Sequence, residues 1–147
     1  MIFLHIQELS VDDHIPQIKP FMDQFNSNQE LALPPYDRVH FSLAAYEGEQ
    51  YVGGVVGSMV WGLLYIQLLA VDHVYRGKGI GADLLQAIED QARQQGAKVS
   101  ELTTMSWQAP QFYMKYGYTI FGEIHDIPIE GQTKYYMKKN LLSSTQS

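Results

Sequence analysis

Residues 63–95 constrain the fold most strongly, because a strand, a glycine-rich turn and a helix follow one another directly in this stretch. The run 63–71 is apolar, too short to cross a membrane and bounded by turn residues, so we predict a buried strand. After the turn 76–81, apolar residues recur at the spacing of one buried helix face, and Gly96 is suited to end that helix. The apolar positions of this face are Ile80, Leu84, Leu85, Ile88 and Ala92.

A turn of this kind directs free backbone N–H groups and the positive end of a helix dipole at one point. Such a point suits a phosphate or a pyrophosphate. Glycine permits positive φ and a close approach of the ligand, while Arg76 and Lys78 add positive charge. A Walker-type loop is excluded, because Lys78 is followed by Gly79 instead of Ser or Thr.

Two other interpretations of the turn stay open from these residues alone. Gly77, Gly79 and Ala82 fit a dinucleotide-binding pattern, and Glu101 lies where that pattern expects a ribose-binding acid. Alternatively, the glycines serve only the packing of the strand against the helix. The order of elements argues against a dinucleotide fold, because at least three predicted strands precede the turn.

The rest of the chain predicts further strands and helices. Ser10 and Asp13 have the spacing of a helix start, and apolar residues continue on one helical face to Phe25, with Pro16 and Pro20 disturbing its first half. Residues 31–39 are interpreted as a loop or short helix, and a short helix is expected within 106–115. The predicted strands besides 63–71 are residues 2–9, 41–46, 51–60, 98–105, 118–125 and 133–139.

Two motifs resemble the GNAT superfamily of N-acetyltransferases. Arg76, Gly79 and Gly81 form Arg-x-x-Gly-x-Gly directly after a strand, which is similar to that family's acetyl-coenzyme A motif, and residues 109–118 are similar to its second motif. The motifs lie in the family's order and about 30 residues apart, which is more specific than either motif alone. The resemblance spans residues 2–141 in element order. It implies an α/β (α+β) fold with a mixed, mostly antiparallel sheet of six to seven strands flanked by about four helices.

The resemblance also implies a function, namely transfer of an acetyl group from acetyl-coenzyme A to a primary amine by direct attack. The coenzyme would bind Leu69, Ala70, Val71, Arg76, Gly77, Lys78, Gly79, Ile80, Gly81 and Ala82. Ser106 stands where the family has Asn, and its hydroxyl is the candidate replacement for that contact. The backbone N–H groups of Leu69 to Val71, with Leu69 and Val71 as catalytic positions, would bind the oxyanion.

Tyr113 is the candidate general acid. A thiolate with a pKa near ~8.5 is a moderate leaving group, and a tyrosine with a pKa near ~10 remains protonated at neutral pH and can donate to it. The general base stays open: Tyr65 and Gln67 cannot serve as strong bases, which leaves Glu47, Glu123, His40 and His125. Because no base is evident, a non-catalytic acyl-coenzyme A binding module is the alternative function, followed by a dinucleotide-binding protein.

Composition limits the remaining classes. The chain has 147 residues, no cysteine and a formal net charge of −6, so a cysteinyl acyl-enzyme is excluded and broad nucleic-acid binding is not expected. Neither a secretory signal nor a membrane span is evident, and the five histidines lack metal-ligand spacing. We therefore expect a cytoplasmic protein without a metal, formed by a single domain of residues 1–141 and a frayed tail of residues 142–147. A homodimer stays open.

Overall fold

The computed structural model describes residues 1–27 and 31–142, which divide into two compact units, Met1–Pro35 and Tyr36–Ser147. The first unit contains helix α1 (Val11–Ser27). Ser10 begins it as predicted: its hydroxyl accepts a hydrogen bond from the Asp13 backbone N–H at 3.2 Å and donates one to the Asp13 carboxylate at 2.8 Å. The helix runs continuously through Pro16 and Pro20.

One of the predicted elements is wrong, because residues 2–9 form no strand. The segment predicted as a loop or short helix is a loop, since residues 31–38 form neither helix nor strand. A strand needs a neighbour for its ladder of hydrogen bonds, and the described part of the first unit contains no other strand. Pro34 and Pro35 lack backbone donors, so their segment cannot sustain a helix. The described residues therefore contain three α-helices instead of about four, and the sheet has six strands.

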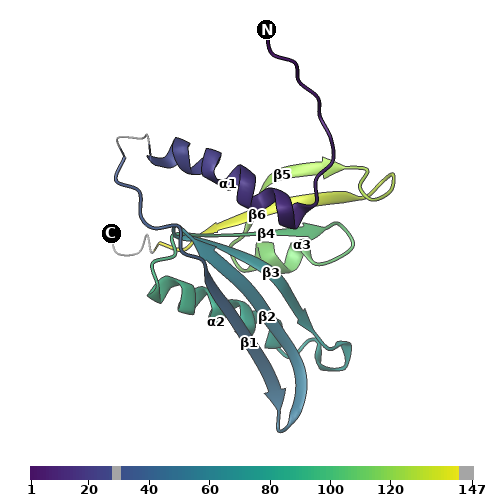
Figure 1. The fold of residues 1–147 in the computed structure, drawn as a ribbon. Helices are drawn as coiled ribbons and strands as arrows, with labels where there is room; N and C mark the ends of the chain where they lie inside the picture. Colours follow the sequence, from purple (N-terminus) through teal and green to yellow (C-terminus); the bar gives the residue numbers. More distant parts are fainter. Residues whose placement is uncertain (28–30, 143–147) are drawn as a thin grey trace. The chain divides into compact units, whose positions relative to one another are not determined.

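The second unit is built on a single sheet in the order β1-β2-β3-β4-β6-β5 (Figure 1). All neighbouring strands are antiparallel except β3 and β4, which are parallel, as a helical crossover between them predicts. The strands are β1 (Val39–Glu47), β2 (Gln50–Val60), β3 (Leu63–Val71), β4 (Val99–Met105), β5 (Thr119–His125) and β6 (Thr133–Asn140). The sheet is thus mixed and mostly antiparallel, as expected.

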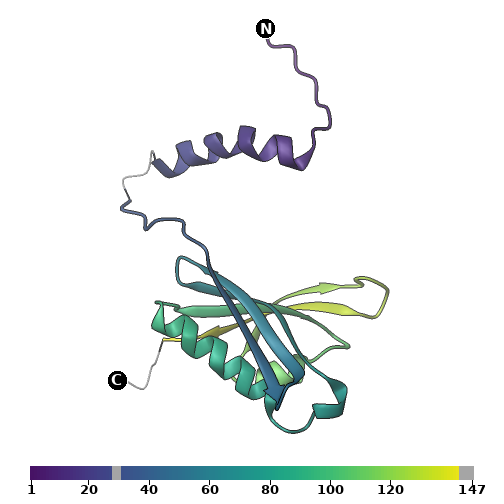
Figure 2. The same cartoon turned by 60° about the horizontal axis from the view of Figure 1, so that its bottom comes forward.

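Helix α2 (Ile80–Gln94) supplies much of the core of this unit. It lies along one face of β1, β2 and β3 (Figure 2) and buries Leu84, Leu85 and Ile88 there, as the apolar spacing predicts. Gly57 of β2 permits this close packing, because a Cβ atom there would lie 2.7 Å from the Tyr65 carbonyl oxygen and 3.0 Å from Ile88 Cδ1. No helix in the described ranges 1–27 and 31–142 has the length and apolar character needed to span a membrane.

A buried polar cluster joins α2 to the second half of the sheet. Glu89 is 1% exposed, and its carboxylate accepts hydrogen bonds from Lys139 Nζ at 2.7 Å and from the Tyr118 hydroxyl at 2.9 Å. The Tyr118 oxygen also lies 2.7 Å from Ser100 Oγ, and Arg93 is 3.7 Å from the same carboxylate. Burial, followed by the nearby Glu89 charge, strongly raises the pKa of Tyr118. The cluster is therefore a satisfied structural network, since each buried group has a partner.

The two halves of the sheet, β1-β2-β3 and β4-β6-β5, are joined by only a short contact. Strands β3 and β4 pair only over three positions, from Leu63 opposite Val99 to Tyr65 opposite Glu101. On the other side of β3, the ladder with β2 shifts register between Val56 and Gly57, so that Gln67 has no partner. Beyond this irregularity β3 stays paired with β2 and separates from β4, which leaves one edge of β3 without a strand neighbour.

Candidate active site

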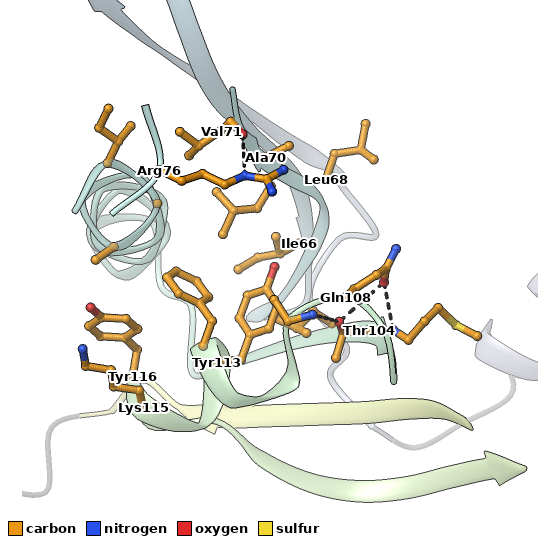
Figure 3. Close-up of a pocket in the computed structure, with 18 of the residues that line it drawn as sticks. Ile66, Leu68, Ala70, Val71, Arg76, Thr104, Gln108, Tyr113, Lys115 and Tyr116 are labelled. Carbon is orange, nitrogen blue, oxygen red and sulfur yellow. Dashed lines mark hydrogen bonds between the residues drawn. The ribbon is translucent and has the colours of Figure 1, made fainter. Parts of the chain in front are cut away.

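A cavity of about 1090 Å³ lies where β3 and β4 separate. Residues 66–71 of β3 and residues 102–105 of β4 form two of its walls, and the glycine bend and the first turn of α2 form another. The segment from Trp107 to Tyr116, which includes helix α3 (Pro110–Lys115), closes it (Figure 3). The structure thus brings the two sequence motifs together around one cavity.

The edge of β3 directs backbone groups into this cavity. The Asp72 N–H donates to the Val52 carbonyl of β2 at 2.8 Å, so Asp72 faces β2. Successive residues of a strand turn their peptide groups to opposite sides, so Ala70 also faces β2, whereas Leu69 and Val71 face the gap. Consistent with this, the Val71 carbonyl accepts a hydrogen bond from Arg76 Nε at 3.4 Å on the open side.

The bend after β3 is shaped by a short capped turn and by two glycines. The Asp72 side chain accepts a hydrogen bond from the Val74 N–H at 3.0 Å and caps the 3₁₀ helix His73–Tyr75. Gly77 and Gly79 have φ of 81° and 82°, a conformation that costs residues with a side chain free energy. Gly79 is the N-cap of α2 and provides no side-chain cap, so the first N–H groups of the helix are left for a ligand or water.

The third glycine of the bend has a different role. A Cβ atom on Gly81 would lie 3.3 Å from Phe112 Cζ, so this glycine allows the first turn of α2 to approach α3 closely. In contrast, a Cβ atom on Gly77 or Gly79 would meet no atom within 4 Å. Open space therefore borders the backbone at the two residues where a phosphate would have to approach it.

The two predicted cations of the bend have different positions. Arg76 lines the cavity, and its guanidinium folds back onto the end of β3 (Figure 3). Lys78 does not line this cavity: its ammonium lies 5.4 Å from the centre of the Tyr75 ring and borders a separate cavity of about 400 Å³. A second cation of the main cavity, Lys115 at the end of α3, was not predicted from the sequence.

Tyr113 directs its hydroxyl into the cavity (Figure 3). Helix α3 begins at Pro110, within the range 106–115 in which a short helix was predicted. The Tyr113 ring packs edge to face against two other rings, and the centres of the Phe112 and Tyr118 rings lie 5.1 Å and 5.8 Å from its own centre. Only 9% of Tyr113 is exposed, and burial raises its pKa. Its hydroxyl has no hydrogen-bond partner among residues 1–27 and 31–142, so it can donate a hydrogen bond to a ligand in the cavity.

Ser106 lies outside the lining of the cavity. Its hydroxyl donates to Gln132 Oε1 at 2.7 Å and accepts from the Thr133 N–H at 3.0 Å, which fixes the end of β4 to the start of β6. Gln108, which was not predicted from the sequence, lines the cavity where Ser106 does not. Its Oε1 accepts a hydrogen bond from the Met105 N–H at 2.8 Å and thereby holds the turn between β4 and α3.

None of the four candidate bases lines the cavity. Glu47 and His40 belong to β1, and Glu123 and His125 belong to β5, which is the edge strand at the other side of the sheet. In the part of the chain that the structure describes, no group of three or more His, Asp or Glu residues could hold a metal ion.

Comparisons with known proteins agree with this architecture. The sequence model of the acetyltransferase (GNAT) family matches residues 5–118. A blasticidin-S acetyltransferase of Streptomyces morookaense is 36% identical over 104 residues, which are 70% of this chain and 76% of that protein. An aminoalkylphosphonate N-acetyltransferase of Salmonella typhimurium is 38% identical over 106 residues, 67% of this chain and 65% of that protein.

Among solved structures, an acetyltransferase from Bacillus cereus superimposes with a TM-score of 0.82 at 31% identity, and the match covers 93% of this chain and 97% of that one. The family match, the relatives and the shared fold lead to one conclusion. This chain belongs to the acetyltransferase (GNAT) family.

Proposed function

We propose that this protein transfers an acetyl group from acetyl-coenzyme A to a primary amine, with direct attack of the amine on the thioester. One observation carries the proposal: a single cavity contains the glycine bend at a helix N-terminus, the unpaired edge of β3 and the hydroxyl of Tyr113. These are the three elements that the reaction needs, namely a diphosphate site, an oxyanion site and a proton donor.

The bend is the proposed diphosphate site. The first N–H groups of α2 and the backbone of residues 77–79 would donate to the phosphate oxygens, and the dipole of α2 would favour their negative charge. The open space beside Gly77 and Gly79 fits this role, because no protein atom would obstruct the approach. Arg76 would exchange its hydrogen bond with the Val71 carbonyl for a stronger, charge-assisted contact with phosphate.

The edge of β3 is the proposed oxyanion site. The N–H groups of Leu69 and Val71 face the gap between the strands and would donate to the thioester oxygen as it gains negative charge. A preorganised donor of this kind typically contributes about 3 kcal/mol to the transition state. The amide groups of the pantetheine arm would pair with the same edge, as an added strand does.

Tyr113 is the proposed general acid. The neutral amine nitrogen forms a bond to the carbonyl carbon, and the C–S bond then breaks as Tyr113 donates its proton to the departing sulfur. The new amide nitrogen releases its extra proton to water, and solvent returns a proton to Tyr113. Burial raises the pKa of Tyr113 above its ordinary value, which suits this role because the phenol holds its proton at neutral pH. No Asp, Glu or His belongs to the described lining of the cavity, so we propose that the amine loses its own proton to water.

The test is an acetylation screen with acetyl-coenzyme A and a panel of primary amines, followed by the release of free thiol and by the mass of each product. We expect at least one amine to gain one acetyl group as thiol is released. The missing base favours a second candidate function, a binding module for acyl-coenzyme A. Binding of coenzyme A without turnover of any amine would support that module, and comparable thermal stabilisation by NAD would instead support dinucleotide binding.

A further inference from the structure

The charge of the cavity is opposite to that of the protein. The chain has a formal net charge of −6, yet the described residues that line the cavity include three cations and no carboxylate. The three cations are Arg76, Lys115 and Lys134. In the described ranges, Lys and Arg form ion pairs with carboxylates only around Glu89 and Asp90, and none of the three belongs to them. The cavity therefore favours the binding of ligands that carry negative charge.

Two of these cations lie at the coenzyme end of the cavity. Arg76 belongs to the bend itself, and Lys115 lies beside Tyr116 at the side of the cavity opposite Gln108, with Tyr113 between them (Figure 3). The diphosphate proposed at the bend accounts for Arg76, and the other phosphate of coenzyme A is a sufficient partner for Lys115. The positive charge of these two residues is thus accounted for without a negative charge on the acceptor.

Lys134 lies at the other end of the cavity. It is the cross-strand neighbour of Met105 at the end of β4, and the Gln108 N–H donates to the Met105 carbonyl at 2.9 Å. Residues of β6 alternate between the two faces of the sheet, and Tyr135 and Met137 pack in the core, so Lys134 is directed to the opposite face. Leu68 of β3, 64% exposed, belongs to that face as well, whereas Leu69 and Val71 pack against the core.

Within the second unit, the cavity consequently passes through the gap between β3 and β4 and opens on both faces of the sheet. On one face it meets the bend and α2, and on the other it meets Lys134 and Leu68. A coenzyme bound at the bend with its thioester at Leu69–Val71 would leave the second opening to the acceptor. Lys134 is thus the one cation of the described lining that the coenzyme does not explain.

We propose that the acceptor is a small primary amine that carries a carboxylate or phosphonate group, and that Lys134 binds this group. The inference rests on the proposed function and adds the class of acceptor. Lys134 is only partly exposed, its ammonium lies 5.2 Å from the centre of the Tyr136 ring, and it has no carboxylate partner in the described residues. An anion bound there would therefore gain a charge-assisted hydrogen bond that the ring does not provide. The positive charge of Lys134 also lowers the pKa of an ammonium bound near it, which favours the neutral amine where the described lining offers no base. A polycationic acceptor would meet repulsion from Lys134, with no carboxylate in the described lining to offset it.

Four acceptors with the same two-carbon spacing test this class: 2-aminoethylphosphonate, β-alanine, ethanolamine and 1,2-diaminoethane. We expect kcat/KM for one or both anionic amines to exceed that for ethanolamine at least tenfold, and 1,2-diaminoethane to be the poorest acceptor. The phosphonate and the carboxylate arms identify which anion is preferred. A preference of the wild-type protein for the diamine, or equal rates with all four, would overturn the inference.

The variant Lys134→Gln tests the residue. We expect kcat/KM for the anionic amine to fall about tenfold, which corresponds to about 1.4 kcal/mol, while ethanolamine turnover and the KM for acetyl-coenzyme A stay unchanged. Lys138→Gln is the matched control, because Lys138 lies four residues further along the same face of β6, over the Phe121 ring, and outside the cavity lining. Lys134→Glu should reverse the order of anionic amine and diamine.

The outcomes separate this inference from the function on which it rests. Equal losses for charged and neutral acceptors in Lys134→Gln, or no loss at all, would overturn the role of Lys134 but leave amine acetylation intact. Coenzyme A binding without transfer to any amine would instead overturn the proposed function, and the acceptor class with it.

Discussion

Replacing Tyr113 with Phe removes a single oxygen atom from the cavity. The ring contacts with Phe112 and Tyr118 stay in place, and no protein hydrogen bond is lost, because the hydroxyl has no partner in the described residues. The free energy of unfolding should therefore change by no more than about 0.5 kcal/mol, the usual range for a substitution without a broken interaction. A loss of activity in this variant would then report on chemistry instead of folding.

The expected loss of rate follows from the leaving group. General acids typically contribute roughly 10²- to 10⁴-fold, and a thiolate with a pKa near ~8.5 leaves with only partial help from a proton. We therefore expect the lower end for Tyr113→Phe, a fall in kcat of about 100-fold, or about 2.7 kcal/mol of transition-state stabilisation. The affinity for acetyl-coenzyme A should stay within about twofold, because the proposed binding groups at the bend are untouched.

The pH dependence of the wild-type protein gives a second readout. A general acid is active while it holds its proton, and burial raises the pKa of Tyr113 above its ordinary value near 10. Ionisation of Tyr113 should therefore not reduce the rate below about pH 10, and the rate should rise on the acid side as the amine loses its proton. The Phe variant should retain the acid limb, since that limb belongs to the amine.

The assay is thiol release at saturating acetyl-coenzyme A and amine, with single-turnover measurements to separate chemistry from product release. Calorimetry provides the affinity for the coenzyme. Tyr51→Phe is the control, because Tyr51 lies on β2 outside the cavity lining and loses the same atom. A single-turnover rate within twofold of the wild type would refute the assignment of Tyr113 as the acid, and a parallel loss of affinity would show that its hydroxyl acts in binding.

Two further predictions test the bend and the buried cluster. Gly79→Val should weaken acetyl-coenzyme A binding at least tenfold and lower the free energy of unfolding by about 1–2 kcal/mol. Gly48, in a hairpin turn, also has a positive φ of 60°, so Gly48→Val should lower the stability by a similar amount and leave the coenzyme affinity unchanged. If calorimetry gave the Gly79 variant the same coenzyme affinity as the wild type, the bend would not be the binding site. Glu89→Gln removes the charge that Lys139 and Tyr118 contact and should cost about 3 kcal/mol, the lower end for a broken buried pair because Lys139 is 21% exposed. Thermal unfolding should then begin about 6–12 °C lower, and an unchanged melting temperature would show that the cluster is not stabilising.

Most of the second unit could be predicted from local pattern. Apolar periodicity located α2, β2 and β3 within one or two residues, and the positive φ of Gly96 ends α2 where the sequence indicates. The strand predicted at residues 2–9 shows the limit of this approach. Alternating apolar residues describe a strand that could form, and only a neighbour with free backbone groups allows it to form.

The walls of the candidate site show the same limit. Tyr113, Arg76 and the edge of β3 were predicted, because each belongs to a motif with a local signature. Gln108 and Lys134 belong to no such motif, and Lys115 lies within the second motif but was not predicted to line the site. Their presence in one cavity follows from the register of β4 with β6 and from the start of α3, which the sequence does not state.

The sequence by itself determined the family, the glycine bend and the candidate proton donor, because a positive φ, a helix start and a short motif are properties of neighbouring residues. Only the tertiary structure decided that β3 and β4 pair over three positions and then separate. Pairing between strands joins residues distant in the chain, so neither the cavity nor the charge of its second opening is encoded in any short segment.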